Sequence, residues 1–195
     1  GTGTLSGTAS QVTNASGLAT FGDLSIDLAG SKQLTAASAG LTSAVSNAFT
    51  ITAAVATKLA YVQQPTDAVA GATITPAVTV QLQDAGGNPV ATAGTTITIS
   101  LTSGTGTLSG TASQVTNASG LATFSDLSID TAGPKQFTAA SIGLTSAVSS
   151  AFSITSATAT KLAFVQQPTN AASAATIAPA VTVQLQDAGS NPVAV

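Results

Sequence analysis

Several residue types are missing from this sequence, and their absence excludes whole classes of site. The 195 residues contain no cysteine, histidine, methionine, tryptophan, arginine or glutamate. Without cysteine there is no disulfide, no thiolate nucleophile and no thiolate-based zinc or iron–sulfur site. Without histidine there is no imidazole base or metal ligand. Because no acid–base set for catalysis stands out among the other side chains, we expect no enzymatic activity.

Charge is also scarce, which limits the kinds of partner. Charged residues make up 6% of the chain, against about 25% in an ordinary soluble domain. Four lysines far apart in the sequence offer no basic surface for a phosphate backbone, so we expect no nucleic-acid partner. No apolar run is long enough to span a bilayer, so we expect no membrane insertion by this segment. A net charge of −3 gives little mutual repulsion and favours association between copies.

The abundant residues, Ala, Thr, Ser, Gly and Val, are arranged in a long repeat. Gly1–Phe21 returns letter for letter as Gly104–Phe124. At this offset about 75 of 92 aligned positions are identical, and the period exceeds the roughly 20–50 residues of a solenoid repeat. The sequence therefore predicts the C-terminal part of one repeat at 1–55, a complete repeat at 56–158, and the N-terminal part of the next at 159–195. We expect this chain to be a segment of a longer tandem array.

Within the unit, apolar and polar residues alternate as in half-buried strands. Val78, Val80 and Leu82 alternate with Thr and Gln before the turn Asp84–Pro89. About seven such short runs are separated by turn signals, and no segment has a helical period. We therefore predict an all-β fold, an immunoglobulin-like β-sandwich repeated in a tandem array. Its predicted core residues are Val62, Val78, Val80, Leu82, Ile97, Ile99, Leu101, Phe124, Leu127, Phe137, Val148 and Phe152.

The segment between units is short. Ser156–Thr160 contains neither glycine nor proline. Such a connector restricts how far successive units can move relative to each other. We therefore expect an extended rod with limited bending.

The unit contains two turn motifs. The first is D-x-x-G-N-P-V at Asp84–Val90, and its second copy has Ser190 in place of Gly87. The second is T-[ND]-x-x-G-x-A at Thr116–Ala122. With these motifs the unit resembles bacterial immunoglobulin-like domains of the invasin/intimin type. The resemblance implies an extracellular or cell-surface location and a spacer role in long repetitive adhesins or surface fibres. No segment resembles the lectin-like tips that bind receptors in such proteins.

Few side chains could hold a ligand. We expect no cofactor; the candidates for a calcium site are Asp84 with Asn88, and Asp126 with Asp130. Alternatively, Asp84 and Asn88 shape their turn through bonds to the backbone. For the second pair, few carboxylates are available to a cation that takes about six to eight oxygens. A row of hydroxyls at Thr96–Thr102 could face a sugar or ice, or form the ordinary polar face of a strand.

The sequence thus predicts a structural repeat module of a long bacterial cell-surface or extracellular protein, acting as a stalk or assembling into a fibre. Its expected partners are other repeats or copies of itself, through covalent continuity, lateral packing or strand exchange. The alternative is an adhesive module that recognises a glycan or a host receptor. That alternative predicts exposed aromatic or carboxylate clusters that differ between repeats, whereas differences such as Tyr61/Phe164 and Asp67/Asn170 are mild.

Overall fold

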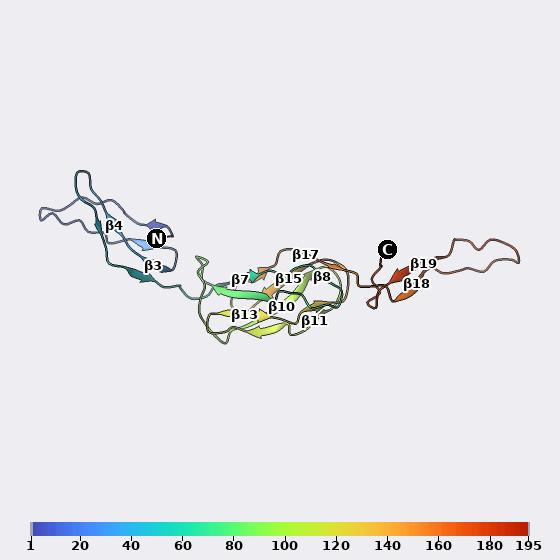
Figure 1. Cartoon of the computed structure of the whole chain (residues 1–195). Coiled ribbons are helices and arrows are strands. Elements are labelled where there is room, and N and C mark those ends of the chain that lie inside the picture. Colours follow the sequence, from blue (N-terminus) through green and yellow to red (C-terminus); the bar gives the residue numbers. More distant parts are fainter. Residues whose placement is uncertain (1, 195) are drawn as a thin grey trace.

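The computed structural model describes residues 2–194, which form only strands and their connections. Figure 1 shows three parts in a row: residues 2–55, a sandwich built from 56–158, and residues 159–194. Within the described range, no helix is long and apolar enough to cross a membrane. The chain is thus a linear series of β-structured parts.

The complete unit consists of two facing sheets. One has the order β13–β9–β7, and the other β12–β10–β15–β17–β8, with β16 also paired to β15. Their bounds are β7 Lys58–Gln63, β8 Ala68–Val69, β9 Val78–Gln83, β10 Thr96–Ser103, β12 Ser113–Val115, β13 Leu121–Phe124, β15 Gly133–Ala140, β16 Ala147–Val148 and β17 Phe152–Thr155. All pairs in these sheets are antiparallel except β8 beside β17. The arrangement confirms the predicted immunoglobulin-like sandwich.

The core lies between the two sheets. Alternation places Val78, Val80 and Leu82 of β9 on the buried face, opposite Ile97 and Ile99 of β10. The rings of Phe137 and Phe152 are tilted by 56° with centroids 4.9 Å apart, a favourable geometry for an aromatic pair. Phe124 and Leu127 complete the predicted set of buried residues, whereas Leu101 is only partly buried against them.

Two core predictions are wrong. Val62 is 63% exposed and Val148 is 57% exposed. The β7–β9 register shifts between Tyr61 and Gln63, and this bulge turns Val62 outward. Val148 stands on the two-residue strand β16, which is separate from β17, and it pairs with Thr138 on the outer face of its sheet.

The two flanking parts repeat the pairings of the complete unit at the same offset. In residues 2–55, the pair β1–β2 corresponds to β11–β14 of the complete unit. The pair β3–β6 corresponds to β15–β17, and the pair β4–β5 corresponds to β15–β16. In residues 159–194, β18 pairs with β19 in the register of β7 and β9, bulge included. The additional strands are β1 Leu5–Ser6, β2 Ser25–Ile26, β3 Gly30–Lys32, β4 Thr35–Ala36, β5 Ala44–Val45, β6 Phe49–Ile51, β11 Leu108–Ser109, β14 Ser128–Ile129, β18 Lys161–Gln166 and β19 Thr182–Gln186.

Replacing Tyr61 by phenylalanine is expected to leave the free energy of unfolding unchanged or raise it by about 1–2 kcal/mol. The Tyr61 hydroxyl is buried and has no hydrogen-bond partner among the described residues, and burial raises the pKa of this phenol. The next repeat has Phe164 at the equivalent position. Urea unfolding of both proteins checks the prediction, and a clear loss of stability in Tyr61→Phe would contradict it.

Candidate functional site: the joints between units

The turn Asp84–Pro89 is closed by its own first and fifth residues. The Asp84 carboxylate accepts the Asn88 backbone N–H at 2.8 Å and the Asn88 side-chain amide at 2.9 Å. The Asp84 N–H in turn donates to the Asn88 carbonyl at 3.0 Å. These bonds fix the rotamer of Asn88 and the orientation of its amide. Both side chains are almost fully buried, although the turn projects from the end of the unit.

What buries them is the preceding part of the chain. Asn88 Oδ1 accepts the N–H of Ala29 at 2.8 Å, and Asn88 Nδ2 donates to the carbonyl of Asp27 at 3.0 Å. Asp84 Oδ2 accepts the N–H of Ala54, in the connector, at 3.0 Å. The turn therefore binds both the preceding unit and the segment that leads away from it, and we call this region the first joint.

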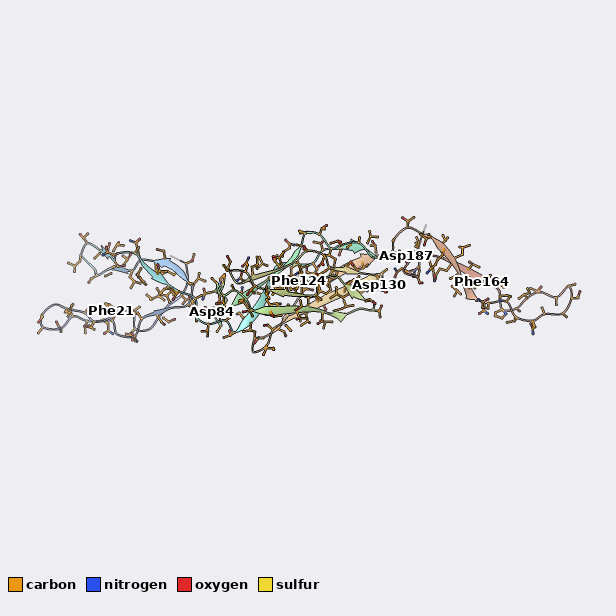
Figure 2. The ribbon with its side chains drawn as sticks, turned by 90° about the horizontal axis from the view of Figure 1, so that it is seen from below. Phe21, Asp84, Phe124, Asp130, Phe164 and Asp187 are labelled. Atoms are coloured by element: carbon orange, nitrogen blue, oxygen red, sulfur yellow. The ribbon has the colours of Figure 1, made fainter. Side chains whose placement is uncertain are left out.

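The second joint has the same bonds one repeat further on. Asn191 accepts the N–H of Ala132 at 2.7 Å and donates to the carbonyl of Asp130 at 2.9 Å. Asp187 accepts the N–H of Ala157 at 2.8 Å. Figure 2 shows Asp84 at one end of the complete unit and Asp130 with Asp187 at the other, with Phe124 between them. The contact therefore occurs twice in this chain.

A glycine in each turn permits the close approach. A Cβ on Gly86 would lie 3.1 Å from the carbonyl oxygen of Asp27, and one on Gly189 would lie 2.7 Å from that of Asp130. Real Cβ atoms are not found at the shorter distance. The backbone of each turn thus lies close against the backbone of the preceding unit, and at Gly189 a side chain does not fit between them without a shift.

All four lysines brace the loops of the joints. Lys32 and Lys135 are buried, and their Nζ atoms donate to the carbonyls of Ala29 and Ala132 at 3.3 Å. On the other side of the joints, Lys58 and Lys161 donate to carbonyls within the turns at 3.2 and 3.3 Å. The lysines that are far apart in the sequence are therefore collected at two places, where they fix main-chain carbonyls.

The aspartates of the joints are held in their charged form. Hydrogen bonds from the Asn88 side chain, above all, lower the pKa of Asp84 below its ordinary value. For Asp187, burial alone would raise the pKa, but hydrogen bonds from Asn191 and from the Ala157 N–H outweigh it, so the pKa is lowered. A carboxylate that accepts several N–H donors resists protonation. Both joints are therefore fully formed near neutral pH.

We expect the joints to open in acid, below the ordinary aspartate pKa of about 3.9. The pKa values of Asp84 and Asp187 are lower in the closed joint than in a free aspartate. The two carboxylates therefore stabilise the joint fully above the ordinary aspartate pKa, and this stabilisation is lost as the pH falls through the lowered pKa values. Distance distributions between spin labels on adjacent units should broaden between pH 5 and about pH 2. In the double variant Asp84→Asn with Asp187→Asn, the distance distribution should already be broad at pH 7 and should not change with pH. A distribution that stays narrow in the parent chain at low pH would contradict this prediction.

The four calcium candidates fall into two different environments. Asp84 and Asn88 lie in the first joint, with their oxygens directed at N–H donors. Asp126 accepts the N–H and the hydroxyl of Thr111, and Asp130 accepts the N–H of Thr107 at 2.8 Å. These hydrogen bonds lower the pKa of both aspartates. In the described part of the chain, no three acidic side chains gather as a metal site would require, so the structure does not bring the two candidate pairs together.

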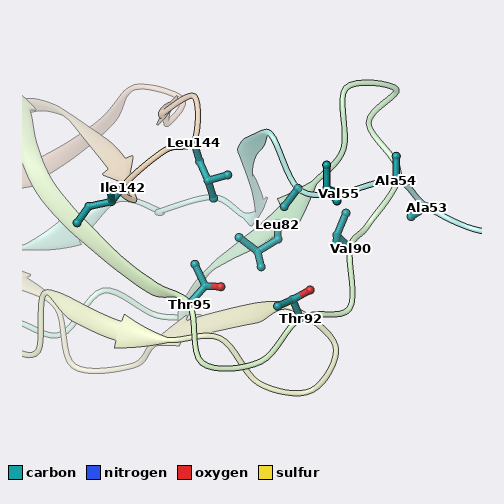
Figure 3. Close-up of a pocket in the computed structure, with 10 residues that line it drawn as sticks. Ala53, Ala54, Val55, Leu82, Val90, Thr92, Thr95, Ile142 and Leu144 are labelled. Carbon is teal, nitrogen blue, oxygen red and sulfur yellow. The ribbon is translucent and has the colours of Figure 1, made fainter.

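An open hollow of about 600 Å³ lies beside the first joint. Figure 3 shows Leu82, Val90, Ile142 and Leu144 around it, with the connector residues 53–56 along one side. The polar lining side chains are Thr92 and Thr95, and no charged residue lines it. A ligand site normally adds convergent polar groups to its apolar wall, so we assign no ligand to this hollow.

The predicted hydroxyl row is present on the outer face of β10. Two of its hydroxyls bond to neighbours: Thr98 pairs with the Ser113 hydroxyl at 3.2 Å, and Thr102 donates to Thr138. The Ser141 hydroxyl donates to the Thr96 carbonyl at 2.7 Å. These contacts tie β10 to its neighbours and match the ordinary polar face of a strand.

The sequence predicts the turn but not its partner. The asparagine bonds across the joints connect residues 59 and 61 positions apart, and the aspartate bonds connect residues 30 positions apart. Their acceptors and donors on the far side are main-chain atoms. One signal was available: Gly86 and Gly189 recur in the two copies of the turn, while the neighbouring Gly87 is replaced by Ser190. A glycine kept where its neighbour varies indicates a close backbone approach.

Comparisons with known proteins add little to this geometry. No family model matches the sequence, and no curated protein matches it. A solved structure described as "Structure of Yersinia pseudotuberculosis InvD" is 18% identical, with a TM-score of 0.45, over 98% of this chain and 59% of that chain.

A second solved structure is a glycosyl hydrolase family 2 member from Bacteroides cellulosilyticus. It is 20% identical, with a TM-score of 0.43, over 66% of this chain and 17% of that chain. This chain spans less than two thirds of either protein. At these values, neither similarity carries an argument about function, which must come from the joints themselves.

Proposed function

We propose that this chain is part of the stalk of a bacterial surface protein, built from immunoglobulin-like units of the invasin/intimin type. Its work is mechanical: it holds whatever lies beyond it at a fixed distance and direction. The observation that carries the proposal is the identity of the two joints, where the same three bonds from an aspartate and an asparagine link each unit to the one before it.

Identical joints have a geometric consequence. When each unit contacts its predecessor through the same atoms, every step along the array applies the same rotation and translation. A head-to-tail contact of this kind that does not close on itself generates an open, helical rod. The side-chain amide, the carboxylate and the lysine-braced loops resist bending at each step, so the rod is stiffer than a series of domains on flexible linkers.

The distribution of charge supports assembly of such rods into fibres. All four lysine ammonium groups bond to loops of the joints, and four of the seven aspartates lie at the joints: Asp27, Asp84, Asp130 and Asp187. The flanks between joints carry mainly hydroxyl and apolar side chains, such as those of β10. Two rods lying side by side would therefore bring few like charges together.

Scattering and electron microscopy of engineered arrays test the proposal. Chains extended by one, two and three further copies of residues 56–158 should give a maximum dimension that grows in proportion to the number of units. Units on flexible linkers would instead grow roughly as the square root of that number. Square-root growth, or compact particles, would overturn the stalk function. The same micrographs distinguish single rods from laterally assembled fibres.

A further inference from the structure

The two sides of each joint contribute different kinds of atom. On the downstream side, the bonds come from the side chains of Asp84 and Asn88. On the upstream side, they come only from the main chain: the carbonyl of Asp27 and the N–H groups of Ala29 and Ala54. The second joint has the same division between side chain and main chain.

The asparagine side chain suits this task because its amide imitates a peptide group. It offers one acceptor and one donor to a carbonyl and an N–H two residues apart, at 3.0 and 2.8 Å. A residue in a parallel ladder likewise donates to one carbonyl and accepts from an N–H two residues further along the neighbouring strand. Recognition of this type depends on the shape of the upstream loop and not on its side chains.

Differences between the two joints agree with this division. On the upstream side, the repeats differ at three positions close to the contact: Leu28/Thr131, Ala53/Ser156 and Val55/Thr158. The bonds nevertheless have the same partners and differ in length by at most 0.2 Å. On the downstream side, the turns are identical except for Gly87/Ser190, where a Cβ would have its nearest neighbour, Lys58 Nζ, at 3.8 Å.

We infer that the specificity of the joint lies in the turn of the downstream unit, and that the turn fits any upstream immunoglobulin-like unit whose end loop presents this carbonyl and N–H pair. The partner is thus recognised by main-chain geometry. Units whose sequences diverge at the upstream loop still join in the same orientation, as long as the loop keeps its shape. In this chain, Asp130 and Lys135 hold that shape through Thr107 and Ala132. The inference rests on the joints of the proposed stalk but not on where the stalk is located.

Spin-label distances in the full chain test it. The chain has no cysteine, so cysteines introduced at the exposed residues Thr50 and Ser100 give one labelled pair across the first joint. An upstream variant combines Leu28→Thr, Ala53→Ser and Val55→Thr, which places the second joint's residues in the first. Its distance distribution should keep the single narrow maximum of the parent. The downstream variant Asn88→Ala should lose that maximum.

Two further variants, one on each side of the first joint, make larger chemical changes. Leu28→Lys introduces a side chain that neither repeat has at this position, and it should still leave the distribution narrow. Asn88→Asp keeps the size of the downstream side chain but removes its donor to the Asp27 carbonyl, and it should broaden the distribution as Asn88→Ala does.

Each outcome decides a specific claim. A narrow parent distribution that broadens in the upstream variants overturns the inference and leaves the stalk proposal standing. Narrow distributions in all variants also overturn it, because the turn would then not determine the joint. A parent distribution without a narrow maximum overturns the proposed rod and this inference with it.

Discussion

Phe137→Ala is expected to lower the free energy of unfolding of the complete unit by about 3–5 kcal/mol. Phe137 is fully buried on β15, next to Leu101 of β10 and against the ring of Phe152. Removing the ring leaves a cavity between two sheets whose hydrogen-bonded strands cannot move together to fill it. Guanidinium unfolding, followed by the far-ultraviolet circular dichroism of the strands, measures the loss.

Phe137→Leu is the matched control, since the preceding repeat has Leu34 at the equivalent position. It keeps most of the apolar volume, so its loss should be about 1–1.5 kcal/mol. Similar losses in the alanine and leucine variants would contradict the cavity argument. A loss below about 1 kcal/mol in Phe137→Ala would show that the site is not tightly packed.

The strands and most of the core could be predicted because they depend on local alternation. Val78, Val80 and Leu82 stand at every second position, and a pleated strand must place them on one face. The misplaced residues mark where alternation fails. Val62 sits at a bulge, and Val148 lies beyond a break in the strand. A one-residue change of register moves a side chain to the opposite face of the sheet. The local sequence pattern does not predict where such a change occurs.

The joints could be predicted only in part. The residue types of Asp84 and Asn88 indicate a turn, and the turn is present. In their second role, Asn88 bonds to atoms about 60 positions away and Asp84 to an N–H 30 positions away. These atoms are main-chain carbonyl and N–H groups, which nearly every residue possesses. The sequence therefore contains no letter that identifies the partner. The partners of the lysines could not be predicted for the same reason. The buried ammonium group of Lys135 donates to a main-chain carbonyl, and the sequence does not identify which one.

Gly189→Ala is expected to separate the complete unit from the one that follows it. The added methyl group would lie 2.7 Å from the Asp130 carbonyl oxygen and 3.0 Å from Asn191 Nδ2. Both neighbours are fixed, one by the backbone and the other by its bonds to Asp187. Relief of the overlap must come from movement of the whole turn, which breaks the bonds of Asn191 to Asp130 and Ala132. We expect a loss of about 1–3 kcal/mol in the contact between units.

Labels at the exposed positions Ser100 and Thr182 report on this joint. The distance distribution of Gly189→Ala should broaden, while the unfolding midpoint of the complete unit should stay that of the parent, because the turn belongs to the next unit. The matched control is Gly87→Ser. The second joint already contains a serine at this position, Ser190, with φ 68°. With labels at Thr50 and Ser100, the distance distribution of Gly87→Ser should stay narrow. If the glycines were required only for the conformation of the turn, Gly87→Ser would broaden the distribution more than Gly189→Ala, because Gly87 has a positive φ and Gly189 does not. Broadening in Gly87→Ser but not in Gly189→Ala would therefore show that the two glycines serve the turn and not the contact between units.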